Sequence, residues 1–197
     1  MTVTAERAFA ANVLGTLAQT VSDRVGIGSA RAAGHGAHAP AALVTLLWYP
    51  ERPITHLAER LRISHPGAVQ LSERLESEGL VRRVPGADGR TKLLTLTASG
   101  KAAAAEVLVE RRAVLERAVD ALDDAQLPGL VDAVCAMLEA LTDTLLTSEF
   151  MCRMCDELCC PDERCPVERA EPAPLHRRGA GYASRPAENG RMPHHFA

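Results

Sequence analysis

The sequence is poor in aromatic side chains. Only 3% of its 197 residues are Phe, Trp or Tyr, and a single tryptophan is present. A β-sandwich draws heavily on aromatic and β-branched side chains, so this shortage favours closely packed helices. With 47% hydrophobic and 24% charged residues, the chain can still bury a globular core.

An overall positive charge is also missing. The chain has 22 basic and 25 acidic side chains and a formal net charge of -3, which excludes a globally basic nucleic-acid coat. The charge is unevenly distributed, because residues 51–101 carry nine basic and six acidic groups, whereas residues 102–150 carry three basic and ten acidic groups. The first segment could therefore face phosphate, and the second would repel it.

Long apolar runs, a secretory signal and enzyme motifs are lacking as well. The longest apolar run, from Ala39 to Tyr49, is interrupted by Pro40 and Thr45 and is shorter than the roughly 20 residues of a membrane span. The N-terminus has no basic and apolar signal segment, so we expect a cytoplasmic protein without membrane contact. No nucleophile elbow, phosphate loop, dinucleotide fingerprint or His-Glu-x-x-His motif is found, and we therefore expect no enzymatic activity.

The first segment has the apolar pattern of an amphipathic helix. Phe9, Val13 and Leu17 recur every four residues, which predicts a helix over about 6–25. Glycines follow from Gly26 on. They predict that the helix ends there in a glycine-rich loop.

Three short helices are expected next. Residues 40–49 have a proline in the first turn and apolar residues on one side, and residues 54–61 have apolar residues at helical spacing. The Ser64 hydroxyl can cap the third helix, which Gly79 ends. The second and third of these helices have the order and lengths of a helix-turn-helix.

A small β-hairpin is expected directly afterwards. Residues 80–84 and 92–97 are β-prone and flank a turn cluster rich in Gly, Pro and Asp. Helix, helix and hairpin together predict a winged helix-turn-helix. The expected fold class is mainly α with a small β-hairpin wing (α+β), flanked by dimerisation helices.

Two further helices are predicted after the hairpin. Residues 98–122 are Ala-rich, and Asp123 or Asp124 can cap a last helix that runs to about residue 146. Its apolar residues repeat at threes and fours: Leu127, Leu130, Val131, Val134, Leu138, Leu141 and Leu145. Such a seam needs a partner, so we expect a homodimer in which this helix forms much of the interface.

A family resemblance is carried by residues 54–100, above all by the wing residues Asp88, Arg90, Leu96 and Thr97. With the helices on either side, this segment resembles the MarR family of bacterial winged-helix regulators. The resemblance implies a homodimer on pseudo-palindromic double-stranded DNA. Such a dimer usually represses transcription and is released by a small-molecule effector or a redox change.

Within this resemblance, a recognition helix enters the major groove with its N-terminal half near the base edges. The exposed candidates are Ser64, His65, Pro66, Val69, Gln70 and Arg74. Gln70 is the predicted base reader, because its amide can pair bidentately with adenine, and Arg74 is predicted to bind phosphate. The family inserts a wing arginine into the minor groove where this sequence has Arg90, which Asp88 would orient. The predicted DNA-binding set also includes Arg83 and Lys92.

Five of the six cysteines crowd one short stretch. Cys152, Cys155, Cys160 and Cys165 have the spacing C-x2-C-x4-C-x4-C, and four thiolates in so short a loop can surround a zinc ion. An iron-sulfur cluster is the first alternative, because Cys160 and Cys165 each precede a proline as in ferredoxin motifs, and a metal-free thiol switch is the second. Cys135 is expected to be a buried hydrophobic residue.

The sequence thus predicts five consecutive parts. They are an N-terminal dimerisation helix with its glycine-rich loop (1–37), a winged helix-turn-helix (38–100), C-terminal dimerisation helices (101–150), a Cys-rich metal-binding element (151–168) and a disordered tail (169–197). The predicted function is sequence-specific transcription regulation, as a repressor, with a metal- or redox-responsive element. The alternative is a metal- or redox-handling protein whose winged helix contacts proteins, but such a protein has no need of Arg90 at the wing tip.

Overall fold

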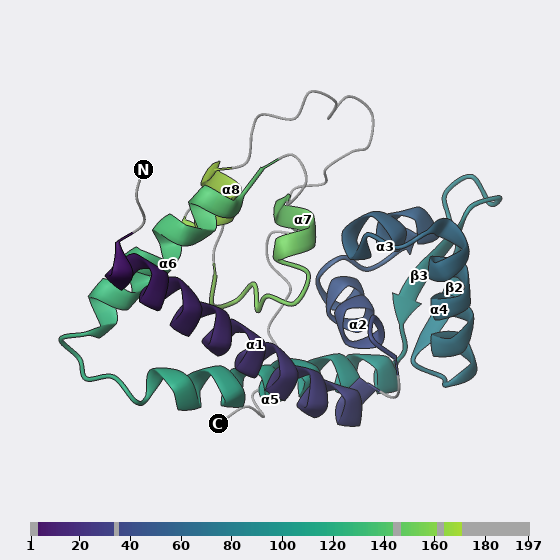
Figure 1. Cartoon of the computed structure of the whole chain (residues 1–197). Coiled ribbons are helices and arrows are strands. Elements are labelled where there is room, and N and C mark those ends of the chain that lie inside the picture. Colours follow the sequence, from purple (N-terminus) through teal and green to yellow (C-terminus); the bar gives the residue numbers. More distant parts are fainter. Residues whose placement is uncertain (1–3, 34–35, 144–146, 161–163, 171–197) are drawn as a thin grey trace.

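The computed structural model describes residues 4–33, 36–143, 147–160 and 164–170. Two long helices, α1 (Ala5–Ala33) and α5 (Ala98–Val119), pack side by side along one edge of the molecule (Figure 1). They join a winged-helix head at one end to α6 (Leu127–Leu141) at the other.

Helix α1 is longer than the sequence predicts. The expected end at Gly26 was wrong, because the helix continues through Gly26 and Gly28 to Ala33. A Cβ atom at Gly28 would lie 2.9 Å from the carboxylate of Glu110 in α5. The absent side chain therefore serves the close approach of α1 and α5, and this packing offsets the roughly 1 kcal/mol that glycine costs inside a helix.

The head contains the predicted helices α2 (Ala39–Trp48), α3 (Ile54–Leu61) and α4 (His65–Ser77). Their apolar faces meet in one core, whose fully buried residues include Leu43, Leu46, Leu57, Leu75 and Leu94. Gly79, with φ of +72°, follows α4 as expected. The helix-turn-helix prediction is confirmed.

The sheet has one strand more than the predicted hairpin. Strands β2 (Val81–Pro85) and β3 (Lys92–Leu96) form the expected antiparallel pair. The strand β1 (Arg52–Pro53) pairs with the other side of β3, so the order is β1-β3-β2. A strand of two residues that includes a proline has no alternating pattern, and for this reason the sequence does not predict β1.

The last predicted helix differs at its start. Helix α6 begins at Leu127, because the Asp123 carboxylate accepts hydrogen bonds from the N–H groups of Ala125 and Gln126 in the turn that precedes it. Helix α6 ends at Leu141, and the seam residue Leu145 lies outside the described residues. Cys135 is half-buried in this single chain and not buried as expected.

The cysteine-rich part forms two short helices, α7 (Ser148–Met151) and α8 (Pro166–Ala170). Helix α7 packs against α3 of the head, and α8 packs against α6 (Figure 1). The predicted disordered tail was placed two residues too early, since residues 169 and 170 belong to α8, and its remainder lies outside the described residues.

Candidate nucleic-acid interface and cysteine site

Helix α4 presents the predicted reading residues on its outer side. The Ser64 hydroxyl caps the helix by accepting the Gly67 N–H at 3.2 Å, as the sequence predicts. The inner side is buried at Ala68, Leu71, Ser72 and Leu75. Ser64, His65, Pro66 and Gln70 are exposed, and Val69 is partly exposed. The N-terminal half of α4 is therefore accessible to a groove of DNA.

Two of the predicted DNA-binding arginines have partners inside the protein. The Arg74 Nε atom is 3.8 Å from a Glu78 carboxylate oxygen, and its guanidinium lies against Gly36, where any Cβ would collide with it. The Arg83 Nε atom is 3.2 Å from a Glu76 carboxylate oxygen. These contacts tie α4 to strand β2 and to the segment before α2, so both arginines position the recognition helix.

The tip of the wing is ordered by one carboxylate. Asp88 Oδ1 accepts hydrogen bonds from the N–H groups of Arg90 and Thr91 at 3.0 and 2.9 Å, and Asp88 Oδ2 accepts the Thr91 hydroxyl at 2.7 Å. The hydrogen bonds from Thr91, and then that from Arg90, lower the pKa of Asp88, which keeps the carboxylate ionised. Arg90 and Lys92 are exposed on this fixed loop.

Thr97 and Gly100 join the wing to α5, and this role was not predicted from the sequence. The Thr97 hydroxyl donates to the Gly79 carbonyl at 2.6 Å and accepts the Gly100 N–H at 3.0 Å, so it also caps α5. A Cβ atom at Gly100 would collide with the Leu80 carbonyl oxygen. The available signal was a threonine at the start of a helical pattern, which is a common N-cap.

The four predicted metal ligands lie around one small cavity of about 30 Å³, which is room for a single ion or water molecule. Its lining residues include Cys152, Cys155, Cys160 and Cys165. The hydrogen bond between Cys152 and Cys155 lowers the pKa of Cys155 against the opposing effect of burial, and the same bond, burial and the neighbouring Cys165 raise the pKa of Cys152. Within the described ranges, no three Cys, His, Asp or Glu side chains are arranged as ligands of one metal. A metal would therefore require the thiols to turn toward the cavity.

A buried arginine faces this cavity from the head. Arg60 of α3 is only 6% exposed, lines the cavity and stacks over the Tyr49 ring at 4.2 Å. Positive charge from Arg111 and Arg60 contributes to the lowered pKa of Cys155. These two cations favour the thiolate of Cys155, the form that binds metal. This role of Arg60 was not predicted from the sequence.

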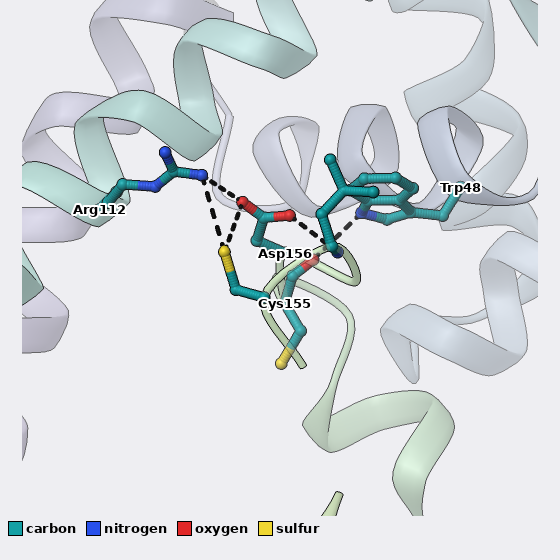
Figure 2. Close-up of polar contacts among 6 residues, drawn as sticks. Trp48, Arg112, Cys155 and Asp156 are labelled. Carbon is teal, nitrogen blue, oxygen red and sulfur yellow. Dashed lines mark hydrogen bonds and ion pairs between the residues drawn. The ribbon is translucent and has the colours of Figure 1, made fainter. Parts of the chain in front are cut away.

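The end of α2 holds the cysteine loop through two aromatic residues to which the sequence assigned no role. The Trp48 Nε1–H donates to the Cys155 carbonyl oxygen at 3.1 Å, and the Tyr49 hydroxyl donates to a Glu157 carboxylate oxygen at 2.7 Å. Burial, and then the hydrogen bond to Glu157, raise the pKa of Tyr49, so its hydroxyl stays protonated. Figure 2 shows Trp48 beside the loop on the side opposite Arg112.

Helix α5 holds the same loop from the other side. The Arg112 guanidinium pairs with the Asp156 carboxylate and lies 3.9 Å from Cys159 Sγ (Figure 2). The ring of Phe150 in α7 lies under the guanidinium of Arg62 at 5.5 Å. Arg62, with φ of +52°, forms the turn between α3 and α4. The loop thus contacts both the scaffold helix and the helix-turn-helix.

Solved structures resemble the chain over most of its length. A MarR family protein from Bacillus stearothermophilus covers 70% of this chain and 98% of its own length, with a TM-score of 0.60 and 19% identity. The chain has the winged-helix fold of the MarR family. YusO from Bacillus subtilis matches this MarR-type fold with a TM-score of 0.61 and 21% identity, covering 70% of this chain and 99% of its own. MepR, a transcription regulator of the Staphylococcus aureus multidrug efflux pump MepA, matches with a TM-score of 0.58 and 16% identity, covering 67% of this chain and 98% of its own.

The MarR-type fold confirms the expected fold class. This assignment rests on structural similarity alone. No protein-family model matches the sequence, and no curated protein matches it. Among the described helices, none combines the length and the apolar character needed to cross a membrane.

Proposed function

We propose that this chain is a sequence-specific DNA-binding transcription regulator, acting as a repressor. The observation that carries the proposal is the exposed N-terminal half of α4 beside a wing whose Arg90 loop is fixed by Asp88. Such a helix suits the major groove, and a wing arginine suits a narrow minor groove. Structures of the same fold include transcription regulators, which supports this function. In the proposed function, no residue is catalytic.

A homodimer is part of this proposal. Large apolar side chains are exposed on α1 and α6 in the single chain, among them Phe9 at 71%, Leu17 and Val131 at 50% and Leu141 at 59%. A soluble protein rarely leaves so much apolar surface in water, and a second copy would cover it. A twofold axis would then present two recognition helices to successive major grooves of a pseudo-palindrome.

We further propose that the cysteines hold zinc, with an iron-sulfur cluster and a metal-free thiol switch as the alternatives. Four sulfur donors and no open position are typical of a structural zinc site, and the cavity of about 30 Å³ suits one ion better than a cluster. Sulfurs around tetrahedral zinc stand about 3.8 Å apart, which is close to the hydrogen-bonding distance of the thiols. Bound zinc would fix the loop in one conformation.

A small-molecule effector also has a candidate place. A cavity of about 680 Å³ is lined by residues from α1, α2, the end of α3 and α7, including His38, Arg62 and Phe150. Its lining combines a cation with an aromatic ring, which is suited to an organic effector of mixed polarity. Binding there would contact the turn that leads into α4.

The function is tested by selecting DNA fragments from a random library with the purified full chain and sequencing them. We expect a pseudo-palindrome whose half-sites are centred about one helical turn apart. If no sequence is enriched, the proposed regulator function is contradicted, and a metal- or redox-handling protein whose winged helix contacts proteins is favoured.

A further inference from the structure

We propose that the cysteine segment, described over residues 147–160 and 164–170, is a metal-dependent clasp that sets the position of the reading head relative to α5. This inference rests on the proposed function, because it states how the cysteine site would regulate DNA binding. The clasp consists of three contacts: Trp48 with Cys155, Tyr49 with Glu157, and Arg112 with Asp156.

On the head side, the clasp reaches the helices that carry the recognition helix. Trp48 and Tyr49 stand at the end of α2, whose buried residues form the centre of the head core. Tyr49 also supports the buried Arg60 of α3 by stacking. A movement of the loop would therefore be transmitted to α2 and α3 and, through the Arg62 turn, to α4.

On the scaffold side, the same segment is attached to the helices that lead to the proposed dimer interface. Arg112 belongs to α5, and Arg169 of α8 pairs with Glu139 of α6. The segment thus forms a further bridge between the head and the scaffold helices, besides the packing of α1 and α5 on α2 and of α5 on β3 near the start of the head (Figure 1).

The metal site controls the clasp because ligands and clasp residues are neighbours in the sequence. Cys155 supplies both a proposed ligand sulfur and the carbonyl that Trp48 binds, and Asp156 and Glu157 follow it directly. Helices of four and five residues are too short to hold such a loop on their own. Metal binding should fix these partners, and metal loss should release them.

Trp48 makes the clasp directly observable, because it is the only tryptophan of the chain. We expect its fluorescence emission to change when zinc is removed by a chelator, and to recover at one added zinc ion per chain. In the Cys160→Ser variant, zinc should neither bind with this stoichiometry nor change the emission. Unchanged Trp48 emission on stoichiometric zinc binding would overturn the clasp, as would a wild-type chain that binds no metal.

A second experiment tests whether the clasp transmits the metal state. The double variant Tyr49→Phe and Arg112→Gln removes two contacts and leaves all cysteines in place, while Arg117→Gln on the same helix is the control. Metal content and operator affinity with and without zinc are measured for each. In the wild type and the control, zinc should change the affinity about 5-fold to 150-fold.

The double variant should bind one zinc ion per chain and lose most of this dependence. A double variant that retains the full zinc dependence would overturn the inference. A chain that binds no specific DNA would refute the proposed function instead, and the Trp48 emission would still decide whether the metal sets the clasp.

Discussion

Replacing Thr97 with valine should loosen the joint between the wing and α5. Valine keeps the branched shape and removes the hydroxyl that donates to the Gly79 carbonyl at 2.6 Å and accepts the Gly100 N–H at 3.0 Å. Loss of an N-cap costs about 1 kcal/mol, and loss of one further hydrogen bond costs about 1 kcal/mol. We therefore expect the free energy of unfolding to fall by about 2 kcal/mol.

Urea unfolding followed by circular dichroism measures this difference at a fixed chain concentration, which is needed because dimerisation contributes to stability. Thr97→Ser is the matched control, since serine keeps the hydroxyl, and it should remain within about 0.5 kcal/mol of the wild type. Equal stability of the valine variant and the wild type would refute the role assigned to this hydroxyl.

Two further predictions concern the proposed interface and the half-buried His56. Phe9→Ala should weaken the dimer by about 2 to 4 kcal/mol, since each copy would lose most of one buried aromatic side chain, and sedimentation should show dissociation that Arg7→Ala does not cause. Burial, and then the charge of Arg60, lower the pKa of His56 from 6.5 to about 4, so the folded state favours neutral His56. The unfolded chain takes up a proton on His56 at a higher pH than the folded chain, and the free energy of unfolding therefore falls as the pH falls from about 6.5 toward 4. His56→Gln should flatten stability against pH in this window, and an unchanged slope would contradict the assignment.

Local features of the fold could be predicted from the sequence. The cap at Ser64 and the turn at Gly79 depend on residues within a few positions, and both are present as expected. The wing pattern likewise predicted that Asp88 acts on Arg90, and Asp88 accepts the N–H groups of Arg90 and Thr91, which are only two and three residues away.

Features that depend on distant residues could not be predicted. Helix α1 continues through Gly28 because it packs along α5, and nothing near Gly28 in the sequence indicates this contact. Trp48 donates its hydrogen bond to the carbonyl of Cys155, which lies 107 positions further along the chain. Arg60 has the sequence context of an exposed helix residue, yet it is buried, because it packs on the Tyr49 ring and lines the cavity of the cysteine loop.

The most direct test of DNA reading is the affinity of the chain for its selected operator and for a shuffled sequence, each measured over a range of salt concentrations. Gln70→Ala should lower the operator preference about 5-fold to 150-fold with an unchanged salt slope, because it removes a base contact. Lys92→Ala should weaken binding to both sequences and reduce the slope, because it removes a phosphate contact. If Gln70→Ala and Arg90→Ala both retain the full preference, α4 and the wing are not the surface that reads DNA.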